Sequence, residues 1–431
     1  MRTKGKLAAT GLAMAMGFSL AACSVPLCEE HPDDARCKAD MGTSTDFAVS
    51  STRLSKNGGR VNVVAKVASG TRVVLQFPGG LEVACTIDAS GNGYADVSMT
   101  QLASIAPGQI TVTLKGGDKS IQAKLRVYQP ASFVDMAAAK AALSTGTRQP
   151  TWVQVAKGHV FSAEENATNR RINEYAVNGT TLSGQLPRDP LTNTVLLTTV
   201  LDVTDTQVLR TTMNGAMYSV ENTDIAVDMY TSFKTANLTK VNDIRAKRDG
   251  SMFVVAGEGT DGPLKAFTLP APGGMTSTSV MLGGATTKAV ARAGVGKLTD
   301  ASTLDVIAAH ADGASVFTQK TGAANPSLDQ TLSTAVGSKL AAGLTAMAVG
   351  DIDGDGLDDI IAAQGTNVLV LSVDVSPTTQ VPSVTSTQVL SNLSAMVDAV
   401  AVGDVTGDGK ADLIVAQKAA AMLTVFINQA Q

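Results

Sequence analysis

The chain has 431 residues, of which 44 % are hydrophobic and 17 % charged, and its formal net charge is −4. This length exceeds that of an ordinary single domain, so we expect two or three domains. The near balance of charge argues against a nucleic-acid-binding surface. Aromatic residues make up 4 % of the chain, whereas Gly, Val and Thr are plentiful, which favours an all-β protein of short strands and turns.

Residues 1–22 have the pattern of an export signal, three basic residues near the start followed by LAATGLAMAMGFSLAA. The sequence Leu20-Ala21-Ala22-Cys23 resembles the cleavage motif of bacterial lipoproteins. That resemblance implies a lipid on Cys23 as the membrane anchor and a location in the bacterial cell envelope. Ser24 resembles the signal for the outer membrane if the cell is Gram-negative. The alternative is an ordinary signal peptide with a chance cysteine.

Residues 23–42 are polar, acidic and without periodicity, which indicates a tether. Because export favours oxidation, Cys28 and Cys37 are a possible disulfide, and two unpaired thiols are the alternative. Cys85 alternates with apolar residues in LEVACTI and is expected to be a small core residue.

Residues 43–130 contain six or seven short alternating runs separated by turns such as KNGG and SGNG. This pattern predicts an Ig-like β-sandwich and resembles bacterial Ig-like spacer domains. Residues 131–148 are predicted to be a linker, possibly helical, because SFVDMAAAKAALST combines a capping Ser132 with helix-favouring residues. It either joins the two domains or packs under the second one.

Residues 149–431 repeat with a period of about 54 residues. Four repeat starts are recognisable, at Val241, Val295, Val349 and Val402. Several strands per period predict a β-propeller, with about six blades favoured and five to seven possible. The last repeat holds three strands, and the segment TWVQVAKGHVF (151–161) is expected to supply the missing one.

Two repeats carry matching acidic loops, VGDIDGDGLDDIIAAQ from Val349 and VGDVTGDGKADLIVAQ from Val402. Oxygen-bearing side chains occupy loop positions 1, 3, 5 and 9, so they converge on one point where a hard cation relieves their repulsion. The loops resemble the calcium loops of FG-GAP/VCBS repeats in integrin-alpha-like propellers. The resemblance implies one or two Ca²⁺ sites, with the following ligands: Asp351, Asp353, Asp355, the Leu357 carbonyl and Asp359; Asp404, Thr406, Asp408, the Lys410 carbonyl and Asp412.

An EF-hand requires Glu at loop position 12, where this chain has Ala362 and Val415. The remaining alternative is a pair of metal-free acidic turns. The first loop is predicted to be the better site, because Thr406 replaces a carboxylate in the second. The corresponding loops 297–305 and 243–251 have lost the pattern and are expected to bind no metal.

Catalytic motifs are scarce: the sequence has three histidines and neither HExxH nor GxSxG. The glycine-rich GEGTDG (257–262) is followed by Pro263 and an alternating run, which predicts a hairpin and not a nucleotide site. We therefore expect no enzyme, although propeller enzymes assemble their sites from separate loops.

Together these features predict a lipid-anchored envelope protein that works in binding, adhesion or scaffolding through a calcium-stabilised propeller. Its expected partners are the membrane, through Cys23, and an unidentified envelope or extracellular protein or glycan, with no nucleic acid. The alternatives are a propeller enzyme acting on an extracellular polysaccharide and a glycan-binding propeller.

Overall fold

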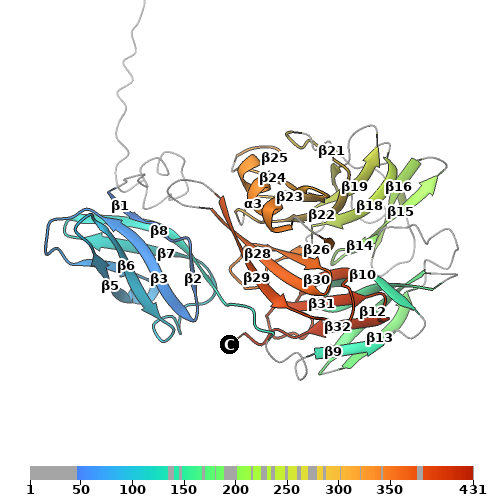
Figure 1. Ribbon diagram of the computed structural model, residues 1–431, viewed down its shortest axis with the longest axis horizontal. Helices are drawn as coiled ribbons and strands as arrows, with labels where there is room; N and C mark the ends of the chain where they lie inside the picture. The colour runs from blue at the N-terminus through green and yellow to red at the C-terminus, as the bar shows by residue number, and fades with distance from the viewer. Residues whose placement is uncertain are drawn as a thin grey trace, which may run out of the picture. The chain divides into compact units, whose positions relative to one another are not determined.

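The computed structural model describes residues 46–133, 140–144, 148–166, 170–179, 181–188, 201–214, 217–224, 231–233, 238–247, 251–259, 264–269, 279–284, 288–300, 302–320, 322–340, 343–375 and 382–430. Asp46–Gln431 forms one compact unit. The predicted signal peptide, Cys23, Cys28, Cys37 and the tether lie outside the described residues. The described part is almost entirely strand, which confirms the all-β prediction (Figure 1).

The N-terminal region is one eight-stranded sheet of order β1-β3-β6-β5-β4-β7-β8-β2. Its strands are β1 (Phe47–Val49), β2 (Arg53–Ser55), β3 (Gly58–Ala65), β4 (Val73–Gln76), β5 (Glu82–Ile87), β6 (Asn92–Ser98), β7 (Gly108–Gly116) and β8 (Lys119–Tyr128), with a 3₁₀ turn η1 (Pro78–Gly80) after β4.

This sheet curls around a single core. β5 pairs with β4 through its first half and with β6 through its second half, so it joins the two halves of the sheet. Alternate residues of both halves bury their side chains together, including Val61, Leu75, Val112 and Leu125. One continuous curled sheet differs from two separate packed sheets, and the Ig-like assignment stays a prediction.

Five further sheets are each built from four consecutive antiparallel strands. They are β10 (Gln149–Ala156), β11 (His159–Glu165), β12 (Arg170–Asn178) and β13 (Thr181–Arg188); β14 (Leu201–Val203), β15 (Gln207–Asn214), β16 (Met217–Asp224) and β17 (Thr231–Phe233); β18 (Leu238–Ala246), β19 (Met252–Gly259), β20 (Leu264–Thr268) and β21 (Ser279–Val280); β22 (Val290–Gly296), β23 (Asp305–His310), β24 (Gly313–Thr318) and β25 (Ser327–Leu328); β26 (Leu344–Gly350), β27 (Asp359–Gln364), β28 (Asn367–Val375) and β29 (Pro382–Leu390).

A sixth four-stranded sheet joins the two ends of the propeller. It consists of β30 (Ala399–Gly403), β31 (Asp412–Gln417), β32 (Met422–Phe426) and β9 (Lys140–Ser144). β9 pairs antiparallel with β32, Ser144 opposite Met422 and Lys140 opposite Phe426. The helix predicted to extend to residue 145 is therefore wrong over 140–144, because pairing with the open edge of β32 outweighs the local helix propensity.

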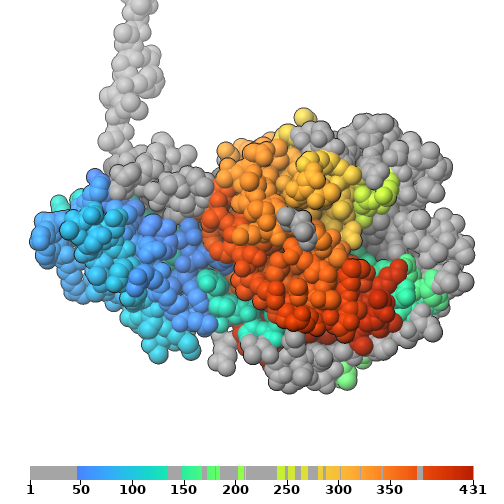
Figure 2. Space-filling view, viewed as in Figure 1, coloured from blue at the N-terminus to red at the C-terminus, as the bar shows by residue number. Residues whose placement is uncertain are grey.

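The segment at 151–161 belongs to β10 and β11 of the first blade, so the prediction that it completes the last sheet is also wrong. The first strands of the six sheets contact one another in a closed series, β10-β14-β18-β22-β26-β30-β10. The predicted range of five to seven blades contains this arrangement. Strands from residues 344 to 430, drawn orange to red, form one continuous surface in the space-filling view (Figure 2).

Glycines allow neighbouring blades to approach closely. A Cβ on Gly350 would lie 2.2 Å from Cγ1 of Val402 in the next blade, and one on Gly296 would lie 2.4 Å from Cγ1 of Val349. Both distances are shorter than any packed contact, so only glycine fits there. Val349 and Val402, which begin two of the repeats, therefore fill space left by the glycine of the preceding repeat.

The helix α3 (Gln330–Leu340) lies between the fourth and fifth blades and contacts β24 and β29. Asp329 begins it, because its Oδ1 accepts a hydrogen bond from the Leu332 N–H (2.8 Å). Leu332, Val336 and Leu340 are buried at helical spacing. Among the described residues no helix is both long and apolar enough to cross a membrane.

Candidate metal centre

The first acidic loop connects β26 to β27. Both carboxylate oxygens of Asp351 accept backbone N–H groups, from Gly354 (2.7 Å) and Gly356 (2.9 Å). These two glycines have φ of 73° and 86°, a region that residues with a Cβ disfavour. The glycines thus fold the chain back so that the side chains of positions 1, 3 and 9 meet.

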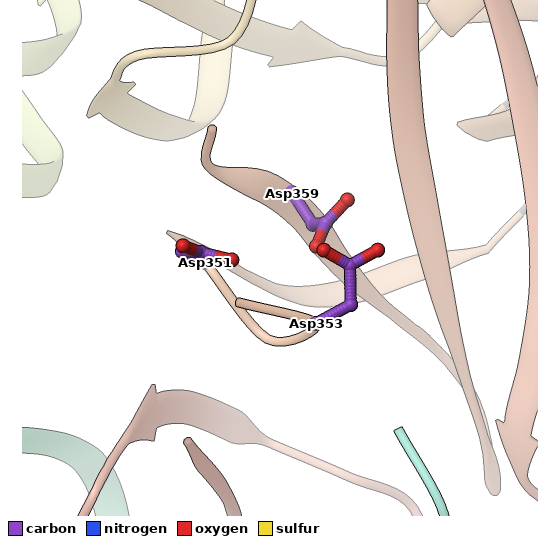
Figure 3. A group of neighbouring side chains, drawn as sticks. All are labelled: Asp351, Asp353 and Asp359. Atoms are coloured by element: carbon purple, nitrogen blue, oxygen red, sulfur yellow. The ribbon is translucent and has the colours of Figure 1, made fainter. Parts of the chain in front are cut away.

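Asp351, Asp353 and Asp359 form the acidic cluster of this loop. One carboxylate oxygen of each lies within 4.8 Å of those of the other two (Figure 3). Asp359 begins β27, and its Oδ1 accepts a hydrogen bond from Ser372 Oγ on β28 (2.6 Å), so a rigid strand pair positions the ligand. Three converging carboxylate oxygens are the donor type that Ca²⁺ prefers. The arrangement fits a calcium ion.

Burial makes these carboxylates hard to ionise without a cation. Desolvation raises the pKa of Asp351 to about 6 and that of Asp353 to about 7, with repulsion from Asp355 adding to both, while the Arg53 charge partly offsets the rise at Asp353. The pKa of Asp359 is raised well above its ordinary value, first by desolvation and then by repulsion from Asp353. A bound divalent cation would compensate this charge.

Asp355, the predicted ligand at loop position 5, does not belong to the cluster of Asp351, Asp353 and Asp359. It is 3 % exposed, and its Oδ2 lies 3.1 Å from Nε of Arg53 and 3.9 Å from Nη1 of Arg126. Leu357 is buried, and its N–H donates to Asp355 Oδ1 (2.9 Å). Its role as a carbonyl ligand stays a prediction.

Arg53, Arg126 and Asp374 are site residues that sequence reasoning missed. Arg53 pairs with Asp353, and Arg126 Nη2 lies 3.1 Å from Asp374 Oδ1. The arginines come from β2 and β8 of the curled sheet, more than 200 residues before the loop. No local pattern marks them, since each occupies an ordinary strand position in RLS or KLRVY.

The second loop, between β30 and β31, repeats the same turn. Asp404 accepts from the N–H groups of Gly407 (2.7 Å) and Gly409 (2.8 Å). Thr406 Oγ1 lies 3.5 Å from Asp404 Oδ1 and 3.2 Å from Asp412 Oδ2, so positions 1, 3 and 9 again meet. These oxygens also fit a calcium ion.

The remaining predicted ligands of the second loop lie at its edge. Asp408 is partly exposed, and its Oδ1 accepts from the Lys410 N–H (3.0 Å). Lys410 Nζ lies 3.9 Å from Asp408 Oδ2, and no described arginine forms an ion pair with this loop. Desolvation raises the pKa of Asp412, whose Oδ1 accepts from the Asn428 N–H (2.9 Å).

Asn428 connects the two loops. Its Nδ2 donates to Ile352 O in the first loop (3.3 Å) and to Ala411 O in the second (3.1 Å). Its Oδ1 accepts from the N–H of Ser132 (3.0 Å) and of Ala430 (3.1 Å), and the residue is 3 % exposed. A single buried amide thus holds both loops and the segment that precedes β9.

Loops 297–305 and 243–251 are degenerate copies of the same turn. Asp305 keeps position 9, but its Oδ2 accepts from both N–H and Oγ1 of Thr299 (2.8 and 2.9 Å), and desolvation raises its pKa to about 6. In the other copy, Nε of the buried Arg245 lies 3.2 Å from Oδ1 of Asp243, so an arginine of the chain itself pairs with the acidic residue at position 1. Residues 248–250 of that copy lie outside the described part.

A cavity of about 590 Å³ lies where the six inner strands end. The first strand of every one of the six sheets contributes to its lining, with Gln154, Val203, Ala246, Val295, Val349 and Val402 among the lining residues. Asp351 and Asp404, the first positions of both loops, also line the wall, together with Lys56 and Pro107 of the curled sheet. Both candidate calcium loops therefore face the central cavity of the propeller.

Of the cysteines, Cys85 lies in the described part of the chain. It packs against the core of the curled sheet and is an unpaired thiol, and partial burial raises its pKa to about 11. This agrees with the expectation of a core residue. The lipid on Cys23 and the disulfide between Cys28 and Cys37 stay predictions.

Comparison with known proteins supports the repeat. Residues 396–421, which contain the whole second loop, match the family model of the FG-GAP repeat. FG-GAP repeats commonly bind calcium, and the cluster of Asp351, Asp353 and Asp359 is a second place suited to an ion. No curated protein sequence matches this chain.

Several solved structures are similar in fold. A DUF4784 family protein from Bacteroides caccae is 10 % identical over 83 % of this chain and 98 % of its own, with a TM-score of 0.32. The gluconolactonase XC5397 from Xanthomonas campestris is 12 % identical over 69 % and 94 %, with a TM-score of 0.37. TolB from Acinetobacter baumannii is 10 % identical over 73 % and 79 %, with a TM-score of 0.35. At these TM-scores the likenesses carry no argument about function. The chain is a β-propeller protein that carries an FG-GAP repeat at residues 396–421 and begins its described part with a curled eight-stranded sheet.

Proposed function

We propose that this protein is a lipid-anchored cell-envelope protein that binds a partner, in adhesion or scaffolding, through a calcium-stabilised propeller. The observation that carries the proposal is the pair of acidic loops, both at the end of the central cavity and both connected by Asn428. Calcium at these positions would hold the turns that shape this end of the propeller. Its task there is structural.

The wall of the cavity does not favour the polysaccharide-cleaving alternative. Apart from residues predicted as calcium ligands, the acidic residue on the described wall is Asp358, whose Oδ2 accepts from the Lys297 N–H (2.7 Å). A glycosidase needs two carboxylates that flank a bound sugar. A carboxylate committed to a backbone contact between blades is poorly placed for that role.

Two experiments test the proposal separately. The anchor is tested by expressing the full chain in a Gram-negative host with labelled fatty acid. We expect the label in the membrane-bound protein and neither label nor sedimentation for C23S. A labelled or membrane-bound C23S would remove the lipid anchor from the proposal.

Binding is tested with the full chain on arrays of extracellular matrix proteins and glycans, in calcium and in chelator. We expect calcium-dependent binding that D404A weakens, because the second loop would no longer hold its turn. Turnover of a polysaccharide that is lost when cavity-lining residues are substituted would instead support the enzyme.

A further inference from the structure

The carboxylates of the first acidic loop already contact a positively charged side chain of the protein, that of Arg53. β2 and β8 pair in parallel, with Arg53 opposite Arg126, so the edge of the curled sheet presents two guanidinium groups side by side. Arg53 contacts Asp353 and Asp355, and Arg126 contacts Asp374. The guanidinium of Arg53 also lies 4.4 Å from the centre of the Tyr128 ring, which fixes its direction.

Arg53 contacts the oxygens that the turn leaves available. Asp353 Oδ1 accepts from the Asp355 N–H (3.2 Å) and Asp355 Oδ1 from the Leu357 N–H (2.9 Å), so each carboxylate has its Oδ2 left. Both Oδ2 atoms contact Arg53. Positions 3 and 5 of a calcium loop supply ligands through these same two carboxylates.

This contact is buried and joins the curled sheet to the fifth blade. The side chain of Arg53 is 11 % exposed and that of Asp355 is 3 % exposed. The backbone contributes too, because the Gln129 N–H donates to Asp353 O (2.9 Å). A calcium ion and a guanidinium held by the same buried oxygens would repel each other at short range.

We propose that Arg53 competes with calcium for the first loop, so that calcium binding there displaces Arg53 and loosens the curled sheet from the propeller. The second loop, which has no arginine partner among the described residues, takes calcium first, which reverses the order of affinity expected from the sequence. The exchange raises the positive charge at the loop by one, since a divalent ion replaces a single guanidinium charge, and the buried carboxylates compensate for the increase. Because coupling is reciprocal, docking of the curled sheet lowers the calcium affinity of the first loop by the factor by which calcium lowers docking. This inference rests on calcium binding, which is part of the proposed function.

The test measures calcium affinity by calorimetry on the full chain in detergent, in a D404A background that silences the second loop. R53M removes the charge and keeps the unbranched stem. We expect calcium to bind the first loop about tenfold more tightly in R53M, within the usual range of about 5- to 150-fold for coupled sites. R53K retains a positive charge and should show a smaller gain.

The matched control is R60M. Arg60 belongs to the same sheet, lies 3.6 Å from the centre of the Tyr94 ring and pairs with Asp96 (3.0 Å), but it is exposed and its partner lies in β6 of the same sheet and not in the loop. Its substitution should leave calcium affinity unchanged. If R53M bound calcium with the same affinity as its parent or more weakly, the proposal would be overturned, since Arg53 would then have no effect on calcium binding or would favour it. An absence of calcium binding in every variant, D404A or not, would overturn the calcium part of the proposed function as well.

Hydrogen exchange supplies a second measurement that does not depend on affinity. In the otherwise unsubstituted chain we expect calcium to speed exchange of the Gln129 amide, because its acceptor lies in the loop that Arg53 leaves. In R53M this amide should exchange fast with or without calcium. Slower exchange of Gln129 on calcium addition would show that ion and arginine bind together, and would refute the competition.

Discussion

Substituting Asn428 by Ala should destabilise the propeller, because this buried side chain connects both acidic loops. The side chain makes four hydrogen bonds, two from its amide nitrogen to carbonyls of both acidic loops and two to its oxygen from N–H groups. N428A leaves all four partners without this contact in a buried place. At about 0.5 to 1.5 kcal/mol net for each of the four bonds, the expected loss is roughly 2 to 6 kcal/mol.

The assay is urea unfolding at fixed calcium, followed by the fluorescence of Trp152. This is the single tryptophan of the chain, and it lies buried in β10, the strand that packs against β30 and β31. With a slope of about 3 kcal/mol per molar urea, the midpoint of N428A should fall by roughly 0.7 to 2 M. N57A is the control, because Asn57 lies exposed in a turn of the curled sheet.

N428D provides a stricter comparison. It keeps the oxygen acceptor but loses both side-chain amide donors, and it places a negative charge in the residue whose backbone N–H donates to Asp412 Oδ1 (2.9 Å). Its loss should be at least as large as that of N428A. If N428A unfolds at the same urea concentration as N57A, Asn428 does not connect the loops as described.

Three further outcomes are expected. With a Kd of about 10⁻⁴ to 10⁻³ M, 10 mM calcium should stabilise the folded protein by about 1.4 to 2.7 kcal/mol for each occupied site. Calcium should therefore raise the melting temperature of D404A less than that of the parent. An equal rise in both proteins would exclude Asp404 as a ligand. Desolvation in the fold raises the pKa of Asp305 from 3.8 to about 6, so between these pH values the native state binds more protons than the unfolded state. The stability of the protein should therefore fall by up to about 3 kcal/mol as the pH rises from 4 to 6. Urea titrations of D305N should lack this part of the pH dependence, and identical profiles for D305N and the parent would contradict it. G350A should cost about 1 to 3 kcal/mol, because the new Cβ would lie 2.2 Å from Val402 Cγ1, whereas G184A meets its nearest atom at 3.8 Å and should unfold like the parent.

Much of the propeller was predictable because its information is local and repeated. The valine that starts each repeat, the alternating strand after it and the acidic turn between them lie within one stretch of about 20 residues. Neighbouring antiparallel strands joined by short turns need few long-range contacts to be recognised. The convergence of Asp351, Asp353 and Asp359 follows from the same short spacing and was predicted correctly.

The errors arose where distant segments meet. Lys140–Ser144 has helix-favouring residues, yet it becomes a strand because β32, almost 300 residues later, has an open edge to pair with. The curled sheet shows alternating runs in its sequence, but β5 pairs with two neighbours at once, and that register depends on the tertiary fold.

The repeat, the turn that brings the loop oxygens together and the all-β class each depend on residues a few positions apart, so they could be inferred from local sequence patterns. The three-dimensional fold was needed to learn which strand closes the last sheet and that Asn428 connects both loops. It also decided that Arg53 meets Asp353, a pair 300 residues apart in the chain. Burying a charge is strongly destabilising unless an oppositely charged partner is buried beside it. Because the partners here come from distant parts of the chain, no local sequence pattern marks them.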